Sequence, residues 1–156
     1  MKDIKDILIK LSEEVAEYLG IDLIPIEYEN LEIDDSRLIL KPISKIVINI
    51  KYENNFLESA KCITHEMRHI FQIYWANLMD DKFARIWKEE LAQAKSSANI
   101  NVNSNEYNDY SLQAIELDVF AFSQYYLRNR NIYFKYEDKR FQRLVEEYMK
   151  KYLYEN

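Results

Sequence analysis

The chain contains two histidines, and both lie within the short segment THEMRH, as His65 and His69. Apolar residues recur at helical spacing over residues 57–78, so we expect this segment to form a helix. Residues four apart lie on one face of a helix, one turn from each other. Two neutral imidazoles at this spacing can supply two nitrogen ligands to one Zn²⁺ ion. The histidine pair therefore predicts a metal site.

Glu66 directly follows the first histidine. On a helix it lies about 100° from His65, which places the carboxylate beside the metal rather than among its ligands. Zinc lowers the pKa of a bound water to about 7 and polarises a carbonyl. A neighbouring carboxylate can accept the proton of that water as it attacks the carbonyl. The pattern HExxH is thus the one that metal-assisted amide hydrolysis requires, with Glu66 as the general base and then the acid.

A catalytic zinc usually has three protein ligands, and the chain has no further histidine to offer. We expect a carboxylate from the predicted helix at 111–129, which carries Glu116 and Asp118. The two lie about 200° apart on a helix, so at most one faces the metal. Asp118 falls at the edge of the apolar face, and Glu116 lies farther from it. Because a ligand to a buried site should lean toward the core, we predict Asp118 as the third ligand. Glu116 keeps a role beside the metal or with substrate, or is exposed.

The motif HEMRH and the later segment ELDVFAF together resemble the zincin metallopeptidases, and most closely the ImmA/IrrE-type branch. In that branch HExxH is followed by a helix of the form ExEAxxFA. Asp118 matches its second acid, Val119 its alanine and Phe122 its phenylalanine. The longer form THEMRHIFQ is also similar to small zincin-like proteins of bacteria, phages and mobile elements. Asp118 is one methylene shorter than the family's Glu, and Val119 is larger than its alanine.

The resemblance covers residues 46–127, and it implies roles for residues of both segments. It implies that His65 and His69 are zinc ligands and that Glu66 is the catalytic carboxylate. It also implies that the strand near 46–50 precedes the active-site helix and borders the cleft. An exposed edge strand there could pair with an extended peptide substrate.

Other residues near the two segments are candidates for supporting roles. Arg68 stands where the family usually has glycine, and its guanidinium could pair with an acid or simply face solvent. Gln72 shares the histidine face of the helix and could orient a ligand. Tyr107 and Tyr110 are candidates for a donor to the oxyanion. Cys62 is interpreted as a small buried hydrophobe.

The spacing of apolar residues predicts an α+β fold, in one domain spanning residues 1–156, with the element order of a zincin-like protein. An N-terminal helix over 3–19 ends at Gly20, the only glycine, which suits a left-handed cap. Alternating apolar residues predict a small three-stranded sheet, with strands near 24–28, 38–40 and 46–50. The active-site helix and a mainly helical C-terminal part follow, with helices near 57–78, 80–95, 111–129 and 137–153 and a polar loop over 95–110.

Composition and charge argue against several classes of protein. The net charge of −6 argues against nucleic-acid binding through phosphate neutralisation. No apolar run is long enough to span a membrane, and the first residues lack the pattern of a signal peptide. The single cysteine excludes an internal disulfide and fits a reducing compartment. We therefore expect a cytoplasmic protein that acts on a protein or peptide substrate.

The function that the sequence favours is that of a zinc-dependent metallopeptidase. One alternative is a non-catalytic zincin-like protein that binds a protein partner, as a regulator encoded by a phage or mobile element. The presence of Glu66 argues against it, because a pure binding module does not need that carboxylate. A second alternative is a helix that keeps its histidines for packing and binds no metal. Two histidines and one carboxylate also suit Fe²⁺, and Zn²⁺ is favoured because the Glu adjoins the first ligand.

Overall fold

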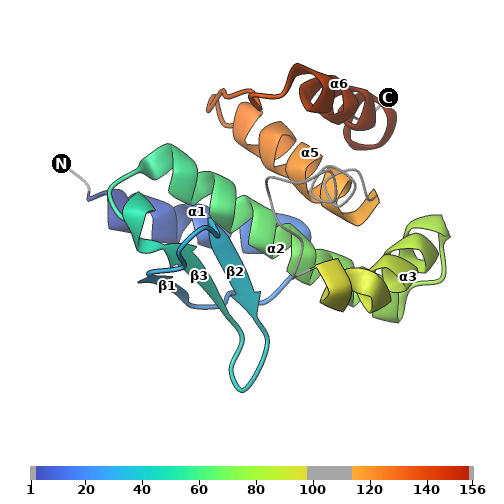
Figure 1. Ribbon diagram of the computed structural model, residues 1–156, viewed down its shortest axis with the longest axis horizontal. Coiled ribbons are helices and arrows are strands. Elements are labelled where there is room, and N and C mark those ends of the chain that lie inside the picture. The colour runs from blue at the N-terminus through green and yellow to red at the C-terminus, as the bar shows by residue number, and fades with distance from the viewer. Residues whose placement is uncertain (1–2, 98–113, 155–156) are drawn as a thin grey trace.

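The computed structural model describes residues 3–97 and 114–154 (Figure 1). The fold is α+β, as the sequence predicts. Helix α1 (Ile4–Leu19) is followed by three strands, β1 (Ile26–Glu29), β2 (Ser36–Ile39) and β3 (Lys45–Asn49), and by the short 3₁₀ helix η1 (Ile50–Tyr52). The later elements are α2 (Phe56–Leu78), α3 (Lys82–Ser97), α5 (Ala114–Arg128), α6 (Lys139–Tyr148) and the π-helical turn η2 (Met149–Leu153). Of the polar loop predicted at 95–110, residues 95–97 continue α3, and the rest lies outside the described residues.

Helix α1 ends where the sequence predicts and begins one residue later, with Asp3 as its cap. The Asp3 side chain accepts a hydrogen bond from the backbone N–H of Lys5, which satisfies one of the free donors of the first turn. Gly20 closes the helix at φ 69°, in the left-handed region, and its N–H bonds back to the carbonyls of Ala16 and Glu17. The prediction of a glycine cap is therefore confirmed. Glycine suits this position because it has no Cβ and adopts the left-handed conformation without a steric penalty.

The sheet has the strand order β1-β3-β2, with β3 in the middle. β3 runs parallel to β1, pairing Ile46 with Ile26, and antiparallel to β2, pairing Ile48 with Ser36. Both edges of β3 are therefore occupied, and its residues 46–49 are buried. The expectation that the strand at 46–50 offers an edge to a peptide needs correction, because the edge strands of this sheet are β1 and β2.

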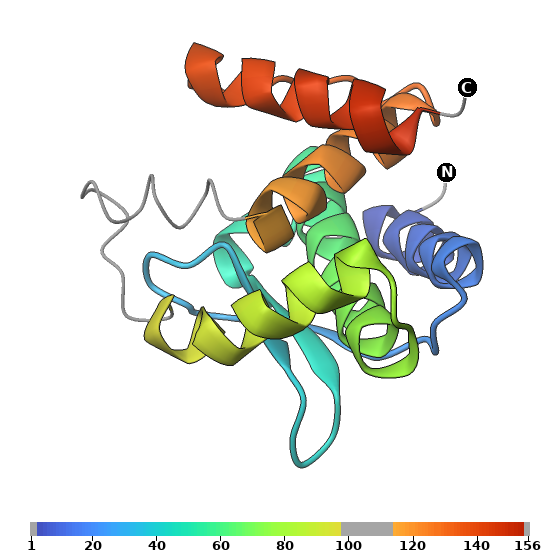
Figure 2. The same cartoon turned by 90° about the vertical axis from the view of Figure 1, so that its right-hand side faces the viewer.

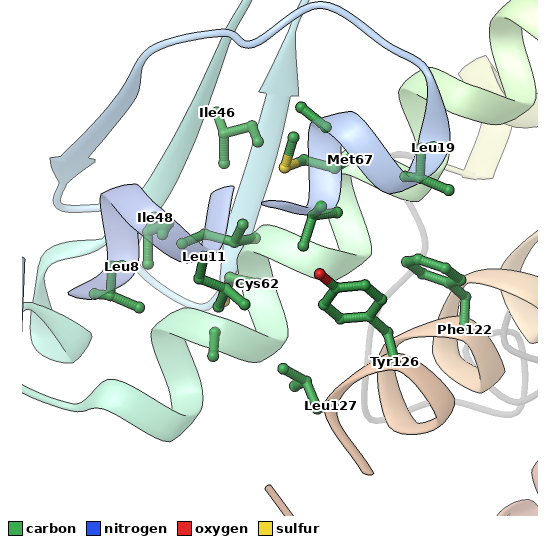
Figure 3. Packing of buried hydrophobic residues seen from close by; sticks show 14 residues of the cluster. Leu8, Leu11, Leu19, Ile46, Ile48, Cys62, Met67, Phe122, Tyr126 and Leu127 are labelled. Carbon is green, nitrogen blue, oxygen red and sulfur yellow. The ribbon is translucent and has the colours of Figure 1, made fainter. Parts of the chain in front are cut away.

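Helix α2 lies between the sheet and α5, and α5 in turn lies between α2 and α6 (Figures 1 and 2). The core fills the space where α1, β3, α2 and α5 meet, as Figure 3 shows. Its labelled side chains are Leu8, Leu11, Leu19, Ile46, Ile48, Cys62, Met67, Phe122, Tyr126 and Leu127. Packing against the core on one side and α5 on the other fixes which faces of α2 point where. Among the described residues, no helix combines the length and apolar character needed to cross a bilayer.

Candidate metal centre

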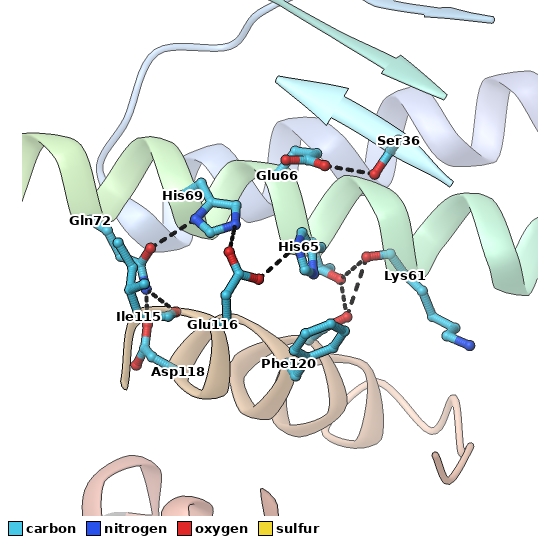
Figure 4. A network of polar contacts seen from close by, with 12 residues as sticks. Ser36, Lys61, His65, Glu66, His69, Gln72, Ile115, Glu116, Asp118 and Phe120 are labelled. Atoms are coloured by element: carbon cyan, nitrogen blue, oxygen red, sulfur yellow. Dashed lines mark hydrogen bonds and ion pairs between the residues drawn. The ribbon is translucent and has the colours of Figure 1, made fainter. Parts of the chain in front are cut away.

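The structure brings His65 and His69 of α2 together with Glu116 of α5 (Figure 4). Nε2 of His69 lies 3.2 Å from one oxygen of the Glu116 carboxylate. Nε2 of His65 lies 3.8 Å from the other oxygen. One donor atom from each residue lies within 4.8 Å of the others. The predicted histidine pair therefore shares one face of α2, and an acid from a second helix stands opposite it.

These three side chains fit a zinc ion by donor type and by spacing. Two imidazoles and one carboxylate form one of the known ligand sets of catalytic zinc, in which a fourth position stays open. Zinc–ligand bonds of about 2.1 Å in a tetrahedron place ligand atoms roughly 3.4 Å apart. The separations of 3.2 and 3.8 Å between the histidine nitrogens and the Glu116 oxygens lie on either side of that value.

The charge of Glu116 acts differently on the two histidines. Burial lowers the pKa of His69, but the charge and hydrogen bond of Glu116, together with the charge of Glu66 and the hydrogen bond to Gln72, outweigh burial and raise the pKa to about 9. Burial lowers the pKa of His65, and the nearby charges of Glu66 and Glu116 only oppose that shift. At neutral pH His65 is thus neutral, while His69 shares a proton with Glu116. A divalent cation bound here would take the place of that proton.

The first turn of α5, which carries Glu116, is held by a side chain from α3. The Glu90 carboxylate accepts hydrogen bonds from the backbone N–H groups of Ala114, at 3.2 Å, and Ile115, at 2.6 Å. Free N–H groups at the start of a helix need such acceptors, and a negative charge there also suits the helix dipole. Glu90 therefore fixes the end of α5 from which Glu116 reaches the histidines.

Asp118, predicted as the third ligand, does not face the histidines. Its buried carboxylate accepts hydrogen bonds from Nε and Nη2 of Arg68, at 2.7 and 2.9 Å. It also accepts one from the Tyr148 hydroxyl at 2.7 Å and one from Nε2 of Gln72 at 2.8 Å. The geometry therefore makes Glu116, not Asp118, the candidate for the third ligand.

The prediction of Asp118 was wrong because α5 does not have a single buried side. Helix α2 covers one side of α5, and α6 with η2 covers another, so acids on different faces are both buried. Glu116 is 4% exposed and Asp118 is 1% exposed. Leaning toward the core therefore does not distinguish them. The sequence signal that could have done so is Arg68, whose charge needs a buried partner if it faces α5.

Arg68 forms the acid pair that was one of its two predicted roles, and its side chain is 11% exposed, so the solvent-facing alternative was wrong. Its guanidinium lies 4.5 Å from the ring centroid of Phe71 and 4.8 Å from that of Phe122. Aromatic faces attract a cation, and the planar group stacks on them well. Arg68 is therefore a buried link between α2 and α5 next to the histidines.

Gln72, predicted to orient a ligand, contacts His69 directly. Its Oε1 lies 2.9 Å from Nδ1 of His69, on the side of the ring away from Glu116. Its Nε2 donates to the backbone carbonyl of Ile115 at 2.9 Å and to Asp118. Ligating histidines are usually held through their second nitrogen in this way.

Glu66 lies on the neighbouring side of α2 and points toward β2 (Figure 4). Its buried carboxylate accepts a hydrogen bond of 2.6 Å from the hydroxyl of Ser36, the first residue of β2. Its charge favours the protonated form of both histidines, but at His65 burial is the larger influence and the pKa is lowered. Ser36 was missed by sequence reasoning, since a lone serine at a strand start carries no signal of this contact.

The remaining sequence candidates are divided between described and undescribed residues. Cys62 is buried, and burial raises the pKa of its thiol to about 12, so it behaves as the small hydrophobe predicted. Tyr107 and Tyr110 lie outside the described residues.

Comparison of the chain with models of protein families, with curated proteins and with solved structures found no match. The zincin resemblance therefore stays a prediction from the sequence motifs alone.

Proposed function

We propose that this protein is a zinc-dependent metallopeptidase that hydrolyses a peptide bond. The observation that carries the proposal is the meeting of Glu116 with His65 and His69, at ion-pair distance, across two helices. Carboxylates buried beside two histidines are costly unless a proton or metal compensates them. Glu66 on the same helix adds the base that hydrolysis needs and that a purely structural metal site lacks.

The residues divide the chemistry between them. His65, His69 and Glu116 would hold the ion and leave one side open. Bound there, zinc would lower the pKa of a coordinated water and polarise the substrate carbonyl. Glu66 accepts a proton as the water oxygen bonds to the carbonyl carbon. It then returns that proton to the departing amine nitrogen as the C–N bond breaks.

Strand β2 gives the proposed site an edge for an extended peptide. β2 pairs with β3 on one side and forms an edge of the sheet. Its first residue, Ser36, touches the carboxylate of Glu66. A peptide that added a strand to β2 would use backbone hydrogen bonds for affinity and would pass near Glu66. This replaces the edge that the sequence had assigned to the strand at 46–50.

The proposal is tested with Glu66→Gln, which removes the base and keeps the size of the side chain. We expect the zinc-loaded protein to cleave members of a mixed peptide library, detected by mass spectrometry. Glu66→Gln should keep its zinc and lose about 10²–10⁴-fold in cleavage rate, the usual contribution of a general base. Full activity in a folded, zinc-loaded Glu66→Gln protein would falsify the mechanism.

The matched control is Glu58→Gln, the same substitution on the same helix. Glu58 lies in the first turn of α2 and pairs with Lys61 near the surface, away from the metal ligands. We expect this variant to keep both zinc and activity. Zinc binding without cleavage in the unmodified protein would instead favour the non-catalytic, partner-binding alternative.

A further inference from the structure

A line of hydrogen bonds joins the C-terminal helix α6 to the candidate metal ligand His69. It runs from the Tyr148 hydroxyl to Asp118, from Asp118 to the Gln72 amide, and from Gln72 to Nδ1 of His69. We propose that Tyr148 is a positioning residue for the metal centre and holds His69 in its ligating orientation through this line. The inference rests on the metal site of the proposed function, and not on the hydrolysis itself.

The first step fixes the direction of the Gln72 amide. Both groups near its Nε2, the Ile115 carbonyl and the Asp118 carboxylate, can only accept hydrogen bonds. The amide nitrogen must therefore face them, and Oε1 must face His69. Nδ1 of His69 then donates its proton to Oε1, at 2.9 Å. Once a metal ion takes the place of the proton shared with Glu116, the lone pair of the ring is left on Nε2, the atom that faces Glu116.

The second step fixes Asp118, on which the amide depends. Oδ2 accepts from Nε of Arg68 and from Nε2 of Gln72. Oδ1 accepts from Nη2 of Arg68 and from Tyr148. Arg68 and Tyr148 reach the carboxylate from different helices, α2 and α6. Without the Tyr148 hydroxyl, Oδ1 keeps only one partner in this set, and the carboxylate plane can turn away from Gln72.

The Tyr148 hydroxyl can be tested apart from the packing of its ring. Tyr148 is 9% exposed, and its ring centroid lies 4.8 Å from that of Tyr152. Phenylalanine keeps this ring contact and removes only the donor to Asp118. The matched control is Tyr28→Phe, which removes a hydroxyl that bonds Ser59 at 2.9 Å and has no link to Gln72.

The experiment measures the dissociation constant of zinc by competition with a chromophoric chelator. Substituting a residue that hydrogen-bonds a metal ligand typically weakens metal binding by about 10–100-fold, and we expect that range for Gln72→Leu. Tyr148 acts two contacts farther out, so we expect Tyr148→Phe to weaken zinc binding about threefold to tenfold. Tyr28→Phe should leave it unchanged. Circular dichroism of each variant establishes that the comparison is made on folded protein.

A double-mutant cycle separates positioning from general loosening of the fold. In the Gln72→Leu background the line is cut, so adding Tyr148→Phe should change zinc affinity by less than about twofold. A second readout is the proton on Nδ1 of His69, observed by NMR in the zinc-loaded protein. We expect its signal to be slow to exchange in the unmodified protein and faster to exchange in Tyr148→Phe.

The outcomes distinguish this inference from the proposed function. If the unmodified protein binds no zinc, the metal site is wrong and the inference falls with it. If it binds zinc and Tyr148→Phe matches Tyr28→Phe in affinity and in proton exchange, the inference alone is overturned. Additive effects of Tyr148→Phe and Gln72→Leu would also overturn it, because they would show that Tyr148 acts independently of Gln72.

Discussion

The guanidinium of Arg68 donates two hydrogen bonds to the carboxylate of Asp118, at 2.7 and 2.9 Å. This pair explains why two acids only two residues apart on α5 have different surroundings. Asp118 forms an ion pair with the buried Arg68, while Glu116 faces the two histidines. The site thus combines a structural ion pair and a candidate metal centre on adjacent turns of the same two helices.

Loss of the Asp118 charge should destabilise the fold strongly. Asp118→Asn leaves the guanidinium of Arg68 buried without a counter-charge, and breaking a buried pair in this way costs about 3–5 kcal/mol. Urea unfolding measures this change in the free energy of unfolding. The control is Asp34→Asn, which breaks an exposed pair with Arg37 and should cost at most about 1 kcal/mol. Equal effects of the two substitutions would contradict the structural role of Asp118.

Loss of the Ser36 hydroxyl should slow catalysis without releasing zinc. Ser36→Ala removes the donor to Glu66, at 2.6 Å, and leaves the three candidate ligands in place. A hydrogen bond to a charged group contributes about 1.5–3 kcal/mol, of which a part orients the base, so we expect kcat to fall by about tenfold. The rate is measured on a peptide that the unmodified protein cleaves. Ser44→Ala serves as the control, because the Ser44 hydroxyl, just before β3, donates to the backbone carbonyl of Leu40 and not to Glu66. A loss of zinc in Ser36→Ala would contradict this account, because it would show that Ser36 supports the metal ligands and not only Glu66.

The Arg128–Glu146 pair should make part of the stability depend on pH. A hydrogen bond of 2.9 Å from Arg128 lowers the pKa of Glu146 below its ordinary value of 4.5. A carboxyl group whose pKa is lower in the folded state stabilises the fold above its ordinary pKa. That stabilisation is lost as the pH falls through the lowered folded pKa.

We therefore expect the unmodified protein to exceed Glu146→Gln in stability by about 0.5–1 kcal/mol at neutral pH, because the pair is partly exposed. The difference should shrink as the pH falls below the ordinary pKa of 4.5 and through the lowered folded pKa, which urea unfolding at a series of pH values would show. A difference that stayed constant with pH would mean that the ionised carboxylate of Glu146 does not contribute.

The order and type of the described elements follow from local patterns in the sequence. Apolar residues every three or four positions mark α1 and α2, and alternation marks the strands. Gly20 ends α1 because the left-handed conformation favours a residue without a Cβ. The histidine pair was also local, because a spacing of four residues is enough to place both on one face of α2.

Contacts between distant parts of the chain were not predictable in the same way. Strand order in the sheet depends on pairing across the fold, so the alternation predicted over residues 46–50 did not identify β3 as the middle strand. The continuous apolar run Ile46–Val47–Ile48, buried on both faces, is the local sign of that position. The choice between Glu116 and Asp118 failed because a helical wheel assumes one buried side, and α5 is covered by helices on more than one. Tyr148 and Ser36 reach the site only through tertiary packing, from elements far away in sequence.

The most direct test of the account is the zinc content and affinity of the purified protein beside Glu116→Gln, with Glu146→Gln as the matched control. We predict about one zinc per chain in the unmodified protein and in Glu146→Gln. Glu116→Gln should weaken zinc binding by more than about 100-fold, because it removes a ligand. That is more than is usual for loss of a residue that only hydrogen-bonds a ligand. No zinc in the unmodified protein, or unchanged affinity in Glu116→Gln, would contradict the proposed centre of His65, His69 and Glu116.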